Sequence, residues 1–139
     1  SNVLAEDLIF SGQRALAAAH DLLAALRDPQ ELCLDCADNI DSVRRACDYL
    51  TTFYARIYDD LYERVAAAGQ PSAAWGTLHE GRSYPTSCDF ICMVSPEMFE
   101  HAILPSLEKE MNFLDRTFFH LDGPGALRQS RNSGGNAND

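Results

Sequence analysis

The stretch CDFICMVSPEMFEHAILPSLEKEMNFLDRTFFHLD, residues 88–122, decides the fold that this sequence predicts. It opens with an apolar run at residues 90–94, which has the length of a buried strand. The Ser-Pro-Glu triplet at 95–97 is a strong helix start, because serine caps, proline fits the first helical position and glutamate complements the helix dipole. A second strand is expected at 117–121, and strand, helix and strand in this order build a parallel sheet.

The helix between these strands is expected to turn its apolar side chains inward. The inward residues at helical spacing are Phe99, Ile103, Leu107, Met111 and Leu114. Pro105 lies inside the helix and predicts a kink, because proline lacks the backbone donor and clashes with the preceding turn. A turn at residues 122–125 and a helix start at 126–128 would begin the next unit of the same kind.

The first half of the chain is predicted to be helical. An alanine- and leucine-rich run covers residues 4–27, and the Asp-Pro pair at 28–29 signals the start of a new helix. The longest periodic segment spans residues 42–68. It is expected to end at Gly69, since glycine tolerates the left-handed conformation that follows a helix end.

Prolines and glycines interrupt residues 70–87, where we expect a loop with a short strand at residues 73–78. From residue 129 the sequence is polar and lacks the apolar side chains that drive folding. The prediction is therefore a single α/β domain over residues 1–128, followed by a polar tail over residues 129–139.

Tyr54, Tyr58 and Tyr62 form a stripe at four-residue spacing along the helix expected at residues 42–68. Two interpretations are open. The rings can pack on neighbouring elements with their hydroxyls reaching water, or they can bind a ring-shaped ligand or a partner protein. We favour the packing interpretation.

The composition describes an acidic globular protein. The chain has 139 residues, 11 lysines and arginines against 21 aspartates and glutamates, and a formal net charge of −10. This balance argues against a nucleic-acid or anionic-membrane partner, since both reward clustered positive charge. No apolar run is long enough for a transmembrane helix, and no signal peptide is recognised. We expect a cytoplasmic protein.

Five cysteines are present, and the odd number without an export signal favours reduced thiols. Cys33 and Cys36 have the spacing of half a zinc site. They lie in a helical stretch, and a second pair with matching spacing is missing, so we expect structural, buried thiols rather than metal ligands.

The motifs of the second half resemble the uroporphyrinogen decarboxylase superfamily. In that superfamily an aspartate-bearing strand leads into S-P-x-x-F and, five residues on, L-P, as residues 88–99 and 104–105 do here. The run FHLDGPGALR at residues 119–128 is close to an uncharacterised branch of the superfamily. Shorter pieces that also fit are Leu26-Arg27-Asp28-Pro29 and Ser83-Tyr84-Pro85. The resemblance covers about residues 12–128.

The resemblance implies a TIM-type (β/α) barrel and two possible chemistries. The superfamily includes the cofactor-free decarboxylase of haem synthesis and corrinoid-dependent methyltransferases, in which a histidine, a cysteine two residues later and a further cysteine bind zinc. His120 matches that histidine, and Asp122 takes the position of the first cysteine. Alternate residues of a strand point the same way, so both could meet one ion. The main expectation is no cofactor, with zinc as the alternative.

Three departures from the superfamily shape the fold prediction. A complete barrel takes typically about 250 residues. The later cysteine would lie beyond Arg128, and the strand that carries the catalytic aspartate of the decarboxylase has no match. We therefore predict an α/β, helix-rich partial barrel-like fragment, with long helices in the N-terminal half and two or three short strands in the C-terminal half. Gene truncation or a mobile element would explain such a fragment.

Substrate-binding candidates are residues that would lie near the βα-loop face of a barrel, where substrates bind. They are Trp75, Arg82, Tyr84 and Asp89. Arg82 has two interpretations: it pairs with a carboxylate ligand, or it forms a surface ion pair with one of the many acidic residues. We favour the ion pair.

The leading functional hypothesis is a truncated relative of these barrels without catalysis of its own. Its exposed strand edges would need cover, which another copy of the chain supplies most simply, so we expect a homo-oligomer, a dimer or larger. One alternative is a zinc-dependent methyltransferase-like or decarboxylase-like enzyme whose site is rebuilt between subunits. Another is a protein-binding module that uses the aromatic helix at residues 42–68.

Overall fold

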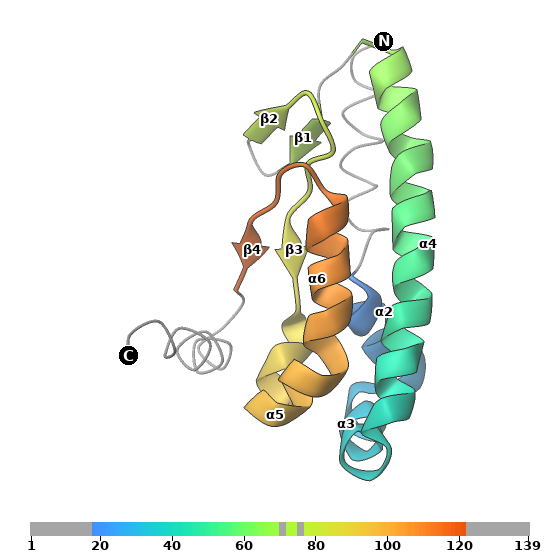
Figure 1. Cartoon of the computed structure of the whole chain (residues 1–139), viewed down its shortest axis with the longest axis vertical. Helices are drawn as coiled ribbons and strands as arrows, with labels where there is room; N and C mark the ends of the chain where they lie inside the picture. The colour runs from blue at the N-terminus through green and yellow to red at the C-terminus, as the bar shows by residue number, and fades with distance from the viewer. Residues whose placement is uncertain (1–17, 70–71, 75–76, 122–139) are drawn as a thin grey trace.

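The computed structural model describes residues 18–69, 72–74 and 77–121. The first elements of the described part are three helices, of which α4 is by far the longest (Figure 1). The helices are α2 (Ala19–Arg27), α3 (Pro29–Asp38) and α4 (Ile40–Ala67). From residue 19 onward these helices confirm the helical first half that the sequence predicts, and residues 4–17 of the predicted run lie outside the described residues. No helix within the described residues is both long enough and apolar enough to cross a membrane.

Local signals place the ends of these helices. The Asp28 carboxylate accepts hydrogen bonds from the backbone N–H groups of Gln30 at 2.9 Å and Glu31 at 3.3 Å, and Pro29 takes the first position of α3. This is the cap that the Asp-Pro pair predicts, because the first N–H groups of a helix have no partner within it. Gly69 follows α4 with φ of 70°, so the predicted glycine stop is confirmed.

A hairpin and a helical crossover follow α4. The hairpin strands β1 (Ser72–Ala74) and β2 (Thr77–His79) pair antiparallel, where the sequence predicts one strand at 73–78. The next elements are the short strand β3 (Thr86–Ser87), the 3-10 helix η1 (Asp89–Met93), α5 (Pro96–Met98), the π-helical turn η2 (Phe99–Ile103), α6 (Leu104–Phe113) and β4 (Phe119–His120).

Strands β3 and β4 pair in parallel on either side of a helical segment, as the predicted strand–helix–strand unit requires, and β4 lies within the strand predicted at residues 117–121. Thr86 pairs with Phe119 and Ser87 with His120, and an isolated parallel bridge joins Ser83 to Arg116. Figure 1 shows the two strands side by side, with α6 between them and α4. The chain is thus helix-rich α/β, with long helices in its first half and short strands in its second half.

The strand expected at residues 90–94 is wrong, because this segment forms the 3-10 helix η1. The Asp21 carboxylate on α2 accepts hydrogen bonds from the backbone N–H groups of Asp89 at 3.2 Å and Phe90 at 3.1 Å, and so caps the first turn. Phe90 and Ile91, which both belong to this helix, are buried. A short apolar run is compatible with either a buried strand or a buried helical turn. The strand of this unit is β3, which ends just before residues 90–94.

The helix of the unit differs from its prediction in two details. The chain widens into the π-helical turn η2 one turn before Pro105, which then lies in the first turn of α6. A wider turn accommodates the ring of proline and the hydrogen bond that it cannot donate. The kink itself stays a prediction. Met111, predicted to face inward, is exposed, and Leu114 is buried but lies after the end of α6.

Two groups of apolar side chains form the core. The larger group joins α2, α3 and α4 to η1 and η2, and includes Leu32, Cys47, Phe90 and Ile103. The smaller group holds the tyrosine stripe: Tyr54 and Tyr58 are buried against Tyr84 and Phe113. The packing interpretation of the stripe is therefore confirmed.

Side chains from helices hydrogen-bond to the backbone at the edge of the β3 segment that faces away from β4, and so close this edge to further strands. The N–H groups of Tyr84 and Thr86 bond to β4, and consecutive residues of a strand direct their backbone groups to opposite edges. On the far edge the Tyr58 hydroxyl accepts from the Ser83 N–H at 2.7 Å and donates to the Ser83 carbonyl at 3.1 Å. Tyr58 thus takes the place of a neighbouring strand. The sequence suggests that its hydroxyl reaches water, but in the structure the hydroxyl binds this backbone instead.

Tyr58→Phe is expected to lower the free energy of unfolding by about 2 kcal/mol, because it leaves the buried N–H and carbonyl of Ser83 without this partner. Tyr62→Phe is the matched control. Its hydroxyl donates to the exposed Glu80 carbonyl at 2.9 Å, where water can replace it, so the loss should stay within about 0.5 kcal/mol. Urea unfolding followed by circular dichroism measures both. Equal losses would show that Tyr58 does not close this edge.

Candidate functional site at the carboxyl ends of the parallel strands

The candidate site lies where β3 and β4 end. Ser87 and His120 are paired at the carboxyl ends of the two strands, and Cys88 and Asp89 follow Ser87 directly. Helix α2 packs against η1 at this point and brings His20 and Asp21 to it. The carboxyl ends of parallel strands are where α/β proteins place ligands and catalytic groups.

His20 is fully buried and holds the far edge of β3. Its Nε2 lies 2.7 Å from the Ser87 carbonyl oxygen. A carbonyl only accepts, so Nε2 donates and carries the hydrogen. Burial lowers the pKa of His20, which keeps the ring neutral and leaves a lone pair on Nδ1. Among the described residues, Nδ1 has no hydrogen-bond partner.

Asp21 and Cys88 complete a cluster with His20. One carboxylate oxygen of Asp21 lies 4.0 Å from His20 Nε2 while the carboxylate also caps η1. Cys88 is buried at the start of η1, and its burial raises the pKa of the thiol far above its usual range, so it is protonated at neutral pH. One ligand atom from each of the three residues lies within 4.8 Å of the other two.

Glu110 on α6 holds the start of α2. Its Oε1 accepts a hydrogen bond from the Ala19 backbone N–H at 2.9 Å, and the side chain is buried on α6. Burial raises the pKa of this carboxyl to about 7, and the nearby Asp21 adds to the shift. Two adjacent residues of α2 therefore bind groups of the second half of the chain: Ala19 binds the buried Glu110, and His20 binds the half-buried Ser87.

The structure separates the substrate-binding candidates. Asp89 lies at the carboxyl end of β3, exposed at the start of η1. Arg82 and Tyr84 lie before β3, toward its amino end. The Tyr84 ring packs on Tyr54 and Tyr58, and burial raises its pKa to about 12. These two residues therefore do not join Asp89 at the strand ends.

Arg82 makes the ion pair that we favoured. Its Nε donates to Asp59 Oδ1 at 2.8 Å, and its guanidinium lies over the Phe113 ring at 4.9 Å from the centroid. Of the metal candidates, His120 ends β4 and is half-buried. Asp122 and Trp75 lie outside the described residues, as do the predicted turn at 122–125, the helix start at 126–128 and the polar tail.

Sequence reasoning missed His20, Asp21 and Glu110. A signal for each is present in the sequence. His20 and Asp21 are adjacent polar residues in an otherwise alanine- and leucine-rich helical run, and Glu110 lies on the inward face of its helix, three residues after Leu107. A polar residue on an apolar face is informative because burying it requires a partner.

The paired cysteines of α3 lie elsewhere. Cys36 is buried in the larger core, and burial raises its pKa to about 11. The half-buried Cys33 thiol lies 3.5 Å from the Met93 carbonyl oxygen, as a weak donor. Burial also raises its pKa. These surroundings are those of packed, protonated thiols, as the sequence predicts.

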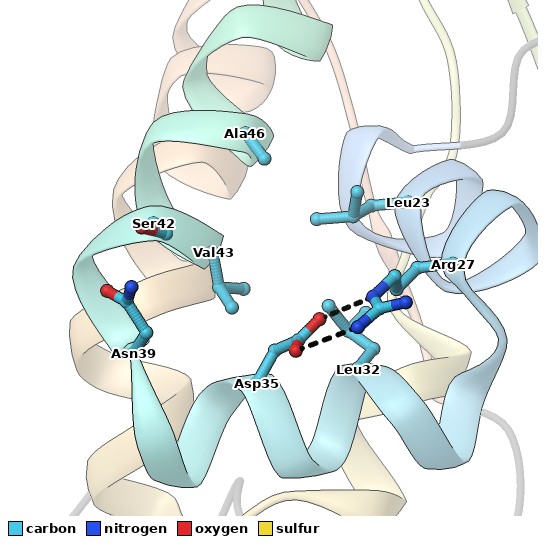
Figure 2. Close-up of a pocket in the computed structure, with 8 residues that line it drawn as sticks. All are labelled: Leu23, Arg27, Leu32, Asp35, Asn39, Ser42, Val43 and Ala46. Carbon is cyan, nitrogen blue, oxygen red and sulfur yellow. Dashed lines mark hydrogen bonds and ion pairs between the residues drawn. The ribbon is translucent and has the colours of Figure 1, made fainter.

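A separate pocket of about 310 Å³ lies between α2, α3 and α4 (Figure 2). Its apolar lining residues are Leu23, Leu32, Val43 and Ala46, and its polar ones are Arg27, Asp35, Asn39 and Ser42. Arg27 donates to both carboxylate oxygens of Asp35, at 2.7 and 3.2 Å, so its charge is already paired. The pocket thus presents no unpaired charge to orient a ligand.

Fold and site together define a helix-rich α/β protein with one parallel strand–helix–strand unit and a buried polar cluster at the ends of its strands. The chain matches no protein-family model, no curated protein and no solved structure. The resemblance to the decarboxylase superfamily is therefore carried by the sequence motifs alone.

Proposed function

We propose that this chain is a relative of the uroporphyrinogen decarboxylase-like barrels that associates with further copies of itself along β4 and has no catalysis as a separate chain. The parallel β3–β4 unit supports the relationship. Its crossover carries the S-P-x-x-F and L-P motifs, with Ser95 capping α5 and Pro105 in the first turn of α6. The separation of Arg82 and Tyr84 from Asp89 supports the absence of a complete substrate site in one copy.

The two edges of the parallel pair carry the proposal of self-association. Tyr58 and His20 bind backbone groups on the far edge of β3, and Pro85 has no N–H to offer there. Within the described residues, β4 pairs only with β3. Phe118 and Leu121, which flank β4 in the sequence, have exposed apolar side chains. A second copy that pairs along β4 would extend the sheet and cover these side chains.

The test is the molar mass of the full chain by light scattering after size exclusion, under reducing conditions and over a range of concentrations. We expect a dimer or larger. The backbone N–H of Leu121 is directed to the outer edge, since the alternate residues Arg116 and Phe118 accept bonds from β3. Leu121→Pro should therefore yield monomers, while Leu121→Ala, which keeps the N–H, should not. A monomeric unsubstituted chain, or equal behaviour of the two variants, would contradict the proposal.

A further inference from the structure

We propose that His20, Asp21 and Cys88 bind one divalent transition-metal ion of the zinc class. The three residues come from α2 and from the junction of β3 and η1, segments more than sixty residues apart that the tertiary structure brings together. This inference is independent of self-association along β4, because all three residues belong to one copy. It also differs from the site that His120 and Asp122 suggest by resemblance.

The donor atoms select the class of ion. An imidazole nitrogen, a carboxylate oxygen and a thiolate sulfur suit zinc or cobalt(II), whereas magnesium and calcium require oxygen ligands. In a tetrahedral zinc site, neighbouring ligand atoms are about 3.5 Å apart. One ring nitrogen of His20, one carboxylate oxygen of Asp21 and the sulfur of Cys88 lie within 4.8 Å of one another, so the cluster needs to close by about 1 Å around the ion.

His20 supplies the observation that points to a ligand. Its ring is fully buried, yet among the described residues no group donates to Nδ1. A buried polar atom without a partner is costly, and few occur in folded proteins. Nδ1 belongs to the same ring as Nε2, which lies 4.0 Å from a carboxylate oxygen of Asp21. A cation held between Nδ1 and that carboxylate would satisfy this lone pair. The bond from Nε2–H to the Ser87 carbonyl is the outer contact that metal-binding histidines commonly make, since it fixes the tautomer and orients the ring.

Charge balance allows a buried ion here. The metal displaces the proton of the Cys88 thiol, which leaves to solvent as the metal–sulfur bond forms. The thiolate and the Asp21 carboxylate then neutralise a divalent cation, and the imidazole adds no charge. Asp21 can keep its bonds to η1, because each carboxylate oxygen has two lone pairs. Its side chain is 17% exposed, and the neighbouring Asp89 is exposed, so solvent reaches the cluster.

The experiment uses the full chain, reduced, stripped with a chelator and refilled with Zn²⁺ or Co²⁺ alone. We expect one ion per chain, a thiolate-to-cobalt charge-transfer band, and tetrahedral cobalt absorption. Cys88→Ser and His20→Gln should lose the charge-transfer band and the stoichiometric ion, respectively. Cys92→Ser removes an exposed thiol four residues away, and His101→Gln an exposed imidazole, so both controls should keep the ion and the band.

X-ray absorption of the zinc-loaded unsubstituted chain counts the sulfur ligands of the ion, and so tests the site even if the variants fail to fold. One sulfur ligand is expected. Two sulfurs would assign the ion to Cys33 and Cys36, and a shell without sulfur would exclude Cys88; either result would overturn the site. No bound zinc, or a charge-transfer band that survives Cys88→Ser, would overturn it as well.

Discussion

The stability of the Glu110→Gln variant relative to the unsubstituted chain is expected to rise by about 3 kcal/mol as the pH increases from about 4.5 to about 8. Glu110 is buried on α6, and its carboxyl binds the Ala19 N–H of α2. Glutamine keeps an oxygen that can accept this hydrogen bond but never ionises. The variant therefore removes the cost of burying a charge and leaves the contact with α2 in place.

The sign follows from the two pKa values. The pKa of Glu110 rises from 4.5 to about 7 on folding, so the folded chain holds this proton more tightly than the unfolded chain. The stabilising contribution is complete below about pH 4.5 and is lost as the pH rises through about 7. Asp21, Tyr54 and Cys47 face the same carboxyl, and Asp21 repels its charge further.

Urea unfolding of both chains at a series of pH values measures this difference. Glu108→Gln, which replaces an exposed glutamate of the same helix, controls for the loss of one negative charge. A difference between Glu110→Gln and the unsubstituted chain that is the same at every pH would show that Glu110 ionises in the fold without cost.

Leu32→Ala is expected to lower the free energy of unfolding by about 3 kcal/mol. Leu32 is 2% exposed and joins α3 to the larger core, where it packs with residues of α2 and α4. Its loss removes apolar contacts and enlarges the neighbouring pocket between the three helices, which Leu32 already lines (Figure 2). A cavity that the surroundings cannot fill adds to the transfer cost of the missing atoms.

Leu34→Ala is the matched control for this effect. Leu34 lies two residues further along α3 and is 59% exposed, so its truncation should change stability by less than about 0.5 kcal/mol. Chemical denaturation of both variants gives the comparison. Similar losses would mean that α3 does not bury the face that carries Leu32.

The helices, their caps and the second strand of the parallel unit could be predicted because short-range signals set them. Asp28 caps α3, Gly69 ends α4 and Ser95 caps α5, each through contacts within a few residues. The residues 90–94 could not be assigned in the same way. Their apolar run is compatible with a buried strand or a buried helix, and a carboxylate from a helix far away in the sequence settles the choice.

The residues of the candidate site also fall into two groups: those that local sequence patterns locate, and those that only long-range contacts bring together. The sequence by itself determined that His120 lies in a short strand near its carboxyl end, because local patterns indicate the strand at residues 117–121. The position of Asp89 just after β3 came from the structure, since the sequence predicts a strand that begins at residue 90. Only the tertiary structure decided that His20 and Asp21 meet Cys88, that Glu110 holds α2, and that Tyr58 closes the edge of β3. These contacts join segments that are distant in the chain. Buried polar groups need hydrogen-bond partners, and the packing of the whole fold determines which donor or acceptor lies close enough.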